Sequence, residues 1–253
     1  MTSLKGKSVI VTGGSSGIGL AAVELLAEAG CDVTIADVDD PAGQAAAKAA
    51  AALGKGRIQF IHTDVGNEDE VRNLVDAAVR AFGKLDGAIN AAGVPPADKR
   101  LHELSSQEWD RGTGINLRGG FLCIKYQILA MLKNGGGSIV AITSTAGHHQ
   151  VPSASEYCSA KGGLNSLCRA AALEYGHANI RVNAVMPGST DTPMFRKANA
   201  RNPAFQEITS RIPLRRVGEP KEVAAAAVWL ISNDASYVSA AVIPVDGAQL
   251  LGC

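Results

Sequence analysis

Tyr157 and Lys161 stand four positions apart, in a stretch with helical periodicity. That spacing places both side chains on one face of a helix. A tyrosine with a pKa near ~10 is a weak base at neutral pH, but a nearby positive charge favours the phenolate and lowers that pKa. The pair is therefore a candidate general acid/base unit. By itself the pattern is unspecific, because Tyr and Lys are common on helices.

Ser144 lies 13 residues before Tyr157, at the carboxyl end of an expected strand, Ser138–Thr143. Its neighbours Thr143 and Thr145 also carry hydroxyl groups. Alternate residues of a strand face opposite ways, which disfavours both neighbours if Ser144 points toward the site.

A glycine-rich turn, TGGSSGIG, follows the first expected strand and opens the first helix, with Gly13, Gly17 and Gly19 spaced G-x-x-x-G-x-G. Small residues let the backbone approach a pyrophosphate, and the N–H groups of the helix N-terminus favour an anion. The turn therefore predicts a dinucleotide site. The alternative is a tight turn that only packs the helix closely on its strand.

Asp37 ends the second expected strand, 18 residues after Gly19. A carboxylate there accepts hydrogen bonds from ribose hydroxyls and repels a 2′-phosphate. No basic residue is placed nearby to bind such a phosphate, so the sequence favours NAD over NADP. The alternative is a solvated turn residue beside Asp39 and Asp40.

Short β-branched runs alternate with longer Ala- and Leu-rich stretches along the whole chain. This alternation predicts an α/β fold, a Rossmann-like doubly wound seven-stranded parallel sheet with helices on both faces. We expect one dinucleotide-binding and catalytic domain over residues 1–253. The expected strands are Ser8–Thr12, Asp32–Ala36, Arg57–His62, Leu85–Asn90, Ser138–Thr143, Ile180–Val185 and Val242–Val245. The expected helices are Leu20–Ala29, Pro41–Leu53, Glu68–Phe82 with Asn67 as N-cap, Ser105–Lys133 with a break around Gly112–Gly114, Ser155–Gly176 and Glu219–Ile231.

The composition excludes several classes of protein. The 253 residues carry 24 basic and 24 acidic side chains, and 46% are hydrophobic, which argues against a disordered chain and a nucleic-acid binder. No apolar run approaches the ~20 residues of a membrane span. The five cysteines show no C-x-x-C pair, so neither a disulfide framework nor a metal site is expected. We expect a cytoplasmic protein without membrane association.

Five motifs occur in a fixed order: TGGSSGIG, NAAG at 90–93, Asn116, Ser144 with YCSAK at 157–161, and Pro187-Gly188 followed by Thr192. In this order they resemble the short-chain dehydrogenase/reductase family in its single-domain form. The resemblance covers the chain from Lys7 to Gly247. Small departures are Cys158, where the family often has Ser, and Ala248, where Gly is frequent.

The resemblance implies roles for individual residues. Tyr157 would be the catalytic acid/base, Ser144 would stabilise the substrate oxygen, Lys161 would hold the nicotinamide ribose, and Asn116 would support a proton relay. Asp64 and Val65 would contact the adenine. The implied cofactor-binding residues are Gly13, Ser15, Ser16, Gly17, Ile18, Gly19, Asp37, Asp64, Val65, Asn90, Ala91, Gly93, Tyr157, Lys161, Pro187, Gly188, Thr190 and Thr192.

The segment at about 189–214 would form a substrate lid. It is poor in helix signals and carries partly apolar residues, which fits either a mobile lid or ordinary helix packing. Its basic residues favour either an anionic substrate or, more readily, a solvated face. Two adjacent histidines, His148 and His149, are candidates for the pocket wall. The lid's apolar residues are Met194, Phe195, Phe205, Ile208 and Leu214, and the basic residues of the slightly longer segment 188–216 are Arg196, Lys197, Arg201, Arg211, Arg215 and Arg216.

The stretches FLCIKYQILAM and YVSAAVIPVDGA are most similar to family members that oxidise cyclic secondary alcohols or cyclohexadiene diols. The resemblance thus implies a small-molecule substrate, NAD-dependent oxidation of a secondary alcohol or the reverse, and a homotetramer. The C-terminal residues from Leu250 would pack on a neighbouring subunit. Alternatives are a 3-oxoacyl-carrier-protein reductase, which Asp37 disfavours, and a non-catalytic NAD-binding sensor, which the complete Ser144/Tyr157/Lys161 set disfavours.

Overall fold

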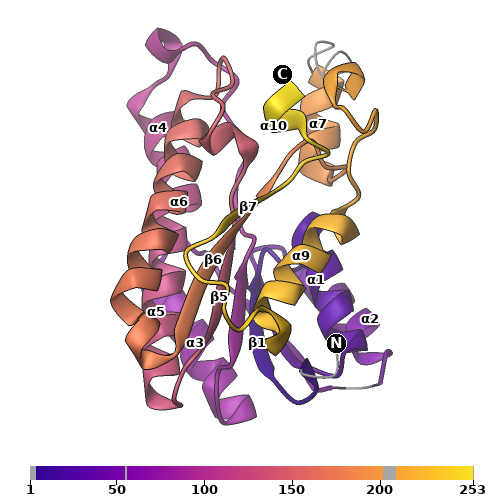
Figure 1. Cartoon of the computed structure of the whole chain (residues 1–253), viewed down its shortest axis with the longest axis vertical. Helices are drawn as coiled ribbons and strands as arrows, with labels where there is room; N and C mark the ends of the chain where they lie inside the picture. Colours follow the sequence, from indigo (N-terminus) through magenta and orange to yellow (C-terminus); the bar gives the residue numbers. More distant parts are fainter. Residues whose placement is uncertain (1–3, 55, 202–208, 253) are drawn as a thin grey trace.

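Seven parallel strands form one sheet in the order β3-β2-β1-β4-β5-β6-β7. In the computed structural model the described residues are 4–54, 56–201 and 209–252. Strand order reverses between β1 and β4, so the loops after these strands diverge, and ligands of doubly wound sheets bind at such a point. The sheet confirms the expected architecture (Figure 1). The strands are β1 (Ser8–Thr12), β2 (Asp32–Asp37), β3 (Ile58–His62), β4 (Gly87–Asn90), β5 (Gly137–Ile142), β6 (Ile180–Pro187) and β7 (Val242–Val245).

Helices cover both faces of the sheet because its strands are apolar on both sides. Val9 and Val11 of β1 face a core with α1, α2 and α9, whereas Ile10 faces a second core with α3, α5 and α6. Figure 1 shows these two helical layers on either side of the sheet. The helices are α1 (Gly17–Glu28), α2 (Asp40–Ala51), α3 (Glu68–Phe82), α4 (Ser106–Thr113), α5 (Gly120–Lys133), α6 (Ser155–Tyr175) and α9 (Pro220–Ile231). Short 3₁₀ helices are η2 (Leu101–Glu103), η4 (Thr145–Gly147), η5 (Gly176–Ala178) and η6 (Asn233–Ala235).

The expected break around Gly112–Gly114 is wrong. A π-helical turn, η3 (Gly114–Gly119), joins α4 to α5 without interrupting the helical backbone. Two later glycines allow close packing: a Cβ on Gly119 would lie 2.8 Å from Val65 Cγ2, and one on Gly120 would lie 2.8 Å from Leu164 Cδ1. A π-turn of this kind often marks a functional position, and this one carries Asn116.

The expected helix-poor segment after β6 contains a helix, α7 (Pro193–Arg201). Thr192 caps it, since its Oγ1 accepts a hydrogen bond from the Phe195 N–H at 3.1 Å, and Pro193 suits the first helical position. Phe205 and Ile208 of the expected lid lie outside the described residues. A short helix, α10 (Gln249–Gly252), follows β7 and lies near α7 at the top of Figure 1.

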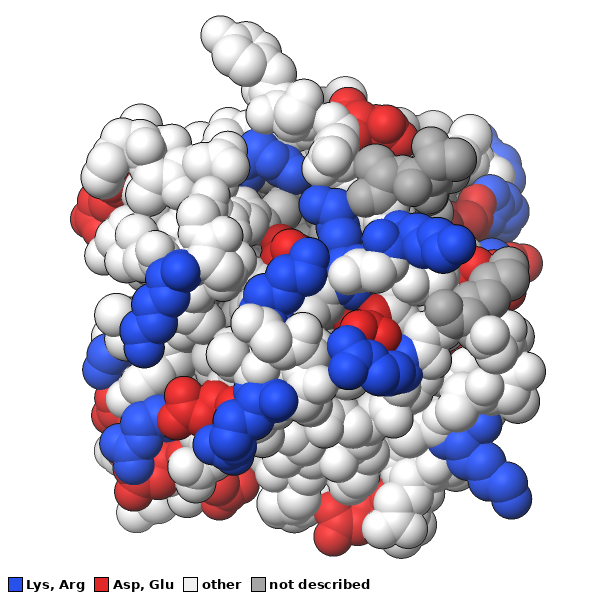
Figure 2. All heavy atoms as spheres, turned by 90° about the horizontal axis from the view of Figure 1, so that it is seen from below, with Lys and Arg blue, Asp and Glu red and all other residues white. Residues whose placement is uncertain are grey.

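Charged side chains of both signs are interspersed on the face shown in Figure 2, with uncharged atoms between them. This distribution accords with the equal numbers of basic and acidic residues in the chain. Among the described helices, none combines the length and apolar character that crossing a membrane requires.

Candidate active site

A cavity of about 450 Å³ opens at the carboxyl ends of the strands, where the loops after β1, β4, β5 and β6 meet. It brings together most of the residues singled out in the sequence. Of those, the ones that line it are Gly13, Ser16, Gly17, Ile18, Gly19, Asp37, Asp64, Val65, Ala91, Gly93, Asn116, Ser144, Tyr157, Lys161, Pro187, Gly188, Thr190 and Thr192.

The glycine-rich turn at one end of this cavity allows backbone segments to approach closely. A Cβ on Gly19 would lie 2.0 Å from the Gly13 carbonyl oxygen, and one on Gly13, at φ +67°, would lie 2.7 Å from the Ala92 nitrogen. Ser16 makes no side-chain cap for α1. The helix therefore presents uncapped N–H groups to the cavity, as binding of a dinucleotide pyrophosphate requires.

Asp37 lines the cavity, and its carboxylate is held by the turn itself. Its Oδ2 accepts hydrogen bonds from the Ser15 hydroxyl at 2.5 Å and the Ser15 N–H at 3.1 Å, and its Oδ1 accepts from the Val38 N–H at 2.8 Å. Ser15 itself does not line the cavity, contrary to expectation. A ribose hydroxyl would compete with Ser15 Oγ for the same carboxylate oxygen. Lys161 is the single basic side chain among the described lining residues.

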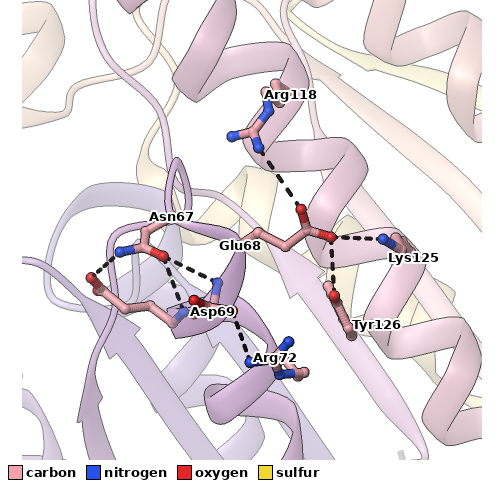
Figure 3. Close-up of polar contacts among 8 residues, drawn as sticks. Asn67, Glu68, Asp69, Arg72, Arg118, Lys125 and Tyr126 are labelled. Carbon is pink, nitrogen blue, oxygen red and sulfur yellow. Dashed lines mark hydrogen bonds and ion pairs between the residues drawn. The ribbon is translucent and has the colours of Figure 1, made fainter.

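The loop after β3, which carries Asp64 and Val65, is held by hydrogen bonds to α3, and α3 is in turn bonded to α5. Asp64 N–H donates to Glu70 Oε2 at 2.7 Å, and Asn67 caps α3, as expected. Figure 3 shows the next link, in which Glu68 Oε1 accepts from Lys125 Nζ at 2.7 Å and the Tyr126 hydroxyl at 3.0 Å, both on α5. These contacts fix the position of the loop expected to meet the adenine.

Thr143, Ser144 and Thr145 all line the cavity, but the hydroxyl group of the first is engaged by a neighbouring strand. Thr143 Oγ1 donates to the Val185 carbonyl of β6 at 3.1 Å. Ser144 faces the cavity, accepts from the Ala146 N–H at 3.1 Å and shares a hydrogen bond with Tyr157. Thr145 also lines the cavity. Ser144 is thus the hydroxyl that the structure places against the tyrosine.

Tyr157 and Lys161 project from the first turns of α6 into the same cavity. Burial raises the pKa of the Tyr157 phenol, and this outweighs the lowering by its hydrogen bond with Ser144. The Lys161 Nζ lies 5.7 Å from the Tyr157 ring centroid and donates to the Ile142 carbonyl at 2.9 Å. Burial lowers the pKa of Lys161 to about 8.

Asn116 fixes the loop after β4. Its Nδ2 donates to the Val94 carbonyl at 3.0 Å, and its Oδ1 accepts from the Val94 N–H at 3.0 Å. Both ends of the amide are engaged with the backbone. A Cβ on Gly93 would lie 2.7 Å from Asn116 Oδ1 and 3.6 Å from Lys161 Nζ, so glycine allows this loop to pass close to both side chains.

Besides Ser15, three expected site residues lie outside the cavity wall. The buried Asn90 side chain pairs reciprocally with Gln127 at 2.9 and 2.8 Å and does not line the cavity. This inward-facing amide needs a polar partner, and α5 supplies it. His148 and His149 are exposed and also lie outside the cavity wall. No group of three metal-binding side chains is found within the described part of the chain.

Two residues at or beside the cavity are not among those expected from the sequence. Glu156, beside Tyr157, is 1% exposed, and its Oε1 accepts from the Ala97 N–H at 2.7 Å, which anchors the loop carrying Val94 and Pro95. Gln249 of α10 reaches the cavity wall from the C-terminal end. Neither belongs to a motif, and only the folded contacts reveal them.

Two of the basic side chains in the segment 188–216 form ion pairs at the surface. Arg196 pairs with Asp191 at 2.7 and 2.8 Å, and Arg216 pairs with Glu222 at 2.6 Å. Neither arginine lines the cavity. This placement agrees with the solvated-face interpretation. The side chain of Arg201 lies outside the described residues.

The chain is similar in sequence to known enzymes. Residues 13–248 match a family described as enoyl-(acyl carrier protein) reductase. The chain is 44% identical, over 98% of both chains, to 2,5-dichloro-2,5-cyclohexadiene-1,4-diol dehydrogenase of Sphingobium indicum. It is 41% identical to cis-4-hydroxycyclohexanecarboxylate dehydrogenase of Sinomonas cyclohexanicum, over 94% of both chains.

The fold also matches that of a solved structure. The crystal structure of levodione reductase superposes with a TM-score of 0.95, at 34% identity, over 98% of this chain and 99% of that one. Levodione reductase of Leifsonia aquatica was also matched by sequence, at 36% identity over 98% of this chain and 96% of that one. The chain belongs to the short-chain dehydrogenase/reductase family of oxidoreductases.

Proposed function

We propose that the protein transfers a hydride between NAD(H) and a cyclic secondary alcohol or its ketone. One observation carries the proposal: Ser144, Tyr157 and Lys161 line the same cavity as the glycine-rich turn. The relatives named for cyclic alcohols and diols support the ring as substrate class. The lid α7, with Met194 and Phe195 on the cavity wall, would exclude water.

NAD, when bound, supplies the hydride acceptor, and the chain supplies the proton chemistry. In alcohol oxidation the Tyr157 phenolate takes the proton of the substrate hydroxyl, and in ketone reduction the phenol returns it. Ser144 donates a hydrogen bond to the substrate oxygen and so stabilises its developing charge. The positive charge of Lys161 favours the phenolate against the raised pKa that burial imposes. Asn116 keeps the loop at Val94 in place beside them.

The test is NADH formation by the purified protein with acyclic, monocyclic and bicyclic secondary alcohols, diols and steroids, with NADP in parallel. Turnover of a cyclic alcohol with NAD supports the proposal. Activity with NADP alone contradicts the NAD assignment and favours a carrier-protein ketoreductase. Binding of NAD without turnover of any alcohol or ketone favours a sensor.

Asp37→Asn is expected to relax the preference for NAD. The amide still accepts the Ser15 hydrogen bond through its oxygen but no longer repels a 2′-phosphate. The ratio of kcat/KM for NAD to that for NADP should fall about tenfold, since tenfold corresponds to ~1.4 kcal/mol. Asp39→Asn, which removes a neighbouring charge outside the cavity wall, is the matched control. An unchanged ratio in Asp37→Asn would refute the role of this carboxylate.

We also propose a homotetramer built on the long helices and the C-terminal strand. Phe121, Leu129 and Leu132 of α5 and Leu173 of α6 are exposed apolar residues, and β7 is an edge strand. Light scattering should give about four times the 26.0 kDa of one chain. Leu132→Glu should lower that mass, because it places a charge in the apolar surface. A monomeric wild-type protein would contradict the proposal.

The four described cysteines are free and buried, which supports a reducing, cytoplasmic location.

A further inference from the structure

We propose that Gln249 determines substrate specificity by donating a hydrogen bond from Nε2 to a second oxygen on an uncharged ring. This oxygen would lie across the ring from the reacting carbon. The inference rests on the proposed hydride transfer and names the substrate class more closely: cyclic diols, hydroxyketones and diketones without a carboxylate.

The C-terminal turn fixes where Gln249 points. Asp246 Oδ1 accepts from the Ala248 N–H at 2.9 Å, and its Oδ2 accepts from the Leu250 N–H at 2.8 Å. The turn thereby brings Gln249 against the end of β6. A Cβ on Gly188 would lie 2.7 Å from Gln249 Oε1, so glycine is needed there for this approach.

The hydrogen bond with Ser189 settles which end of the amide is available. The Ser189 N–H donates to Gln249 Oε1 at 2.8 Å, and a backbone N–H requires an acceptor, so the oxygen must face it. Within the described part of the chain, no hydrogen bond uses Nε2. Gln249 lines the cavity, so its NH₂ group is a donor that a ligand in the cavity can use.

Part of the described cavity wall is apolar and uncharged. Met194, Phe195 and Ala198 of α7 lie on it, with Val151 and Ala154 before α6. The charged side chains among the described lining residues are Asp37, Asp64 and Lys161. The two aspartates follow β2 and β3, and the Lys161 ammonium is bound to the Ile142 carbonyl.

A substrate carboxylate would find no free cation on this wall, and burying an unpaired charge is unfavourable. A neutral ring meets apolar contacts together with one amide donor. Tyr157 reaches the cavity from α6 and Gln249 from α10, and Figure 1 shows α6 along one face of the sheet and α10 above the strands, beside α7 and on the side of α9. The oxygen that Gln249 binds therefore belongs on the far side of the ring.

The test compares NADH-dependent reduction of cyclohexane-1,4-dione and cyclohexanone by the wild-type protein and by Gln249→Glu. Glutamate still accepts the Ser189 hydrogen bond but cannot donate to a ketone oxygen when ionised. The ratio of kcat/KM for the dione to that for cyclohexanone should fall about tenfold in the variant, because one hydrogen bond to the substrate is lost. Dividing the two ratios cancels the greater intrinsic reactivity of the dione.

Gln150→Glu is the matched control, since Gln150 is exposed beside the cavity but does not line it. It should leave the ratio unchanged. We also expect 4-oxocyclohexanecarboxylate to be reduced with a kcat/KM at least about tenfold below that of cyclohexanone, because its charge is unpaired.

The outcomes separate the two proposals. An equal loss for both ketones in Gln249→Glu shows that Gln249 only supports the structure, and overturns the inference. A similar fall in Gln150→Glu attributes the effect to charge and also overturns it, as does efficient reduction of the carboxylate. No turnover of either ketone by the wild-type protein contradicts the hydride transfer itself, and the role of Gln249 fails with it.

Discussion

Tyr157→Phe is expected to lower kcat about 10³-fold, within the range for loss of a general acid/base. The variant keeps the aromatic ring and loses only the hydroxyl that shares a hydrogen bond with Ser144. Stopped-flow or steady-state NADH formation with the best cyclic alcohol measures the loss. NAD binding, followed by fluorescence, should stay within about threefold of the wild type, because the glycine-rich turn and Asp37 are unaffected.

A matched variant separates proton transfer from orientation. Ser144→Ala removes the other partner of the same hydrogen bond and should cost less, about 10²-fold in kcat, because Tyr157 can still move the proton. If Tyr157→Phe retained wild-type turnover, the acid/base would have to be another group, and the proposed chemistry would be wrong.

Lys161→Met is expected to lose activity and gain stability. Lys161 is 5% exposed, and this burial lowers its pKa to about 8 from 10.5. Below about pH 8 the folded state therefore holds an unfavourable buried charge. Methionine fills a similar volume without that charge. The free energy of unfolding at about pH 7 should rise by roughly 1–3 kcal/mol, while kcat falls about 10²-fold.

The sign of the pH dependence follows from proton binding. Between about pH 8 and 10.5 the unfolded chain holds more protons on this lysine than the folded protein does, so wild-type stability rises with pH. The advantage of Lys161→Met in urea unfolding should therefore shrink from about pH 7 to about pH 10. Lys125→Met, at an exposed lysine paired with Glu68, is the control without this trend. A Lys161→Met protein that is less stable than wild type at neutral pH would contradict the prediction.

Much of the fold could be predicted because hydrophobic periodicity and the residues that form turns and helix caps act over a few neighbouring positions. Glu68–Phe82 and Val242–Val245 have the expected bounds, and Asn67 caps its helix as expected. The helix through Gly114–Gly119 could not be predicted in the same way. Glycine weakens an isolated helix, but here it allows contact with Val65 and Leu164, and packing decides the outcome.

The candidate site likewise has a part that the sequence predicts and a part that it does not. Residue types and spacing predict the glycine-rich turn and the set of Ser144, Tyr157 and Lys161. The structure places them in one cavity. The direction of a side chain on a strand that is buried on both faces has no local signal, and the side chain of Asn90, which the resemblance places beside the cofactor, pairs with Gln127. Gln249 enters the wall only because β6 and β7 end side by side.

The two ends of the cavity differ in whether backbone or side chains line them. Backbone and glycine form the dinucleotide end, where Gly13 and Gly19 admit no larger residue, whereas side chains such as Val151, Met194 and Gln249 form the opposite wall. We expect mutation at the first end to impair every reaction that the protein could catalyse, and mutation at the second to alter which molecule fits. Recombining the wall segments that carry Val151, Met194 and Gln249 would then change the substrate range while the redox partner stays the same.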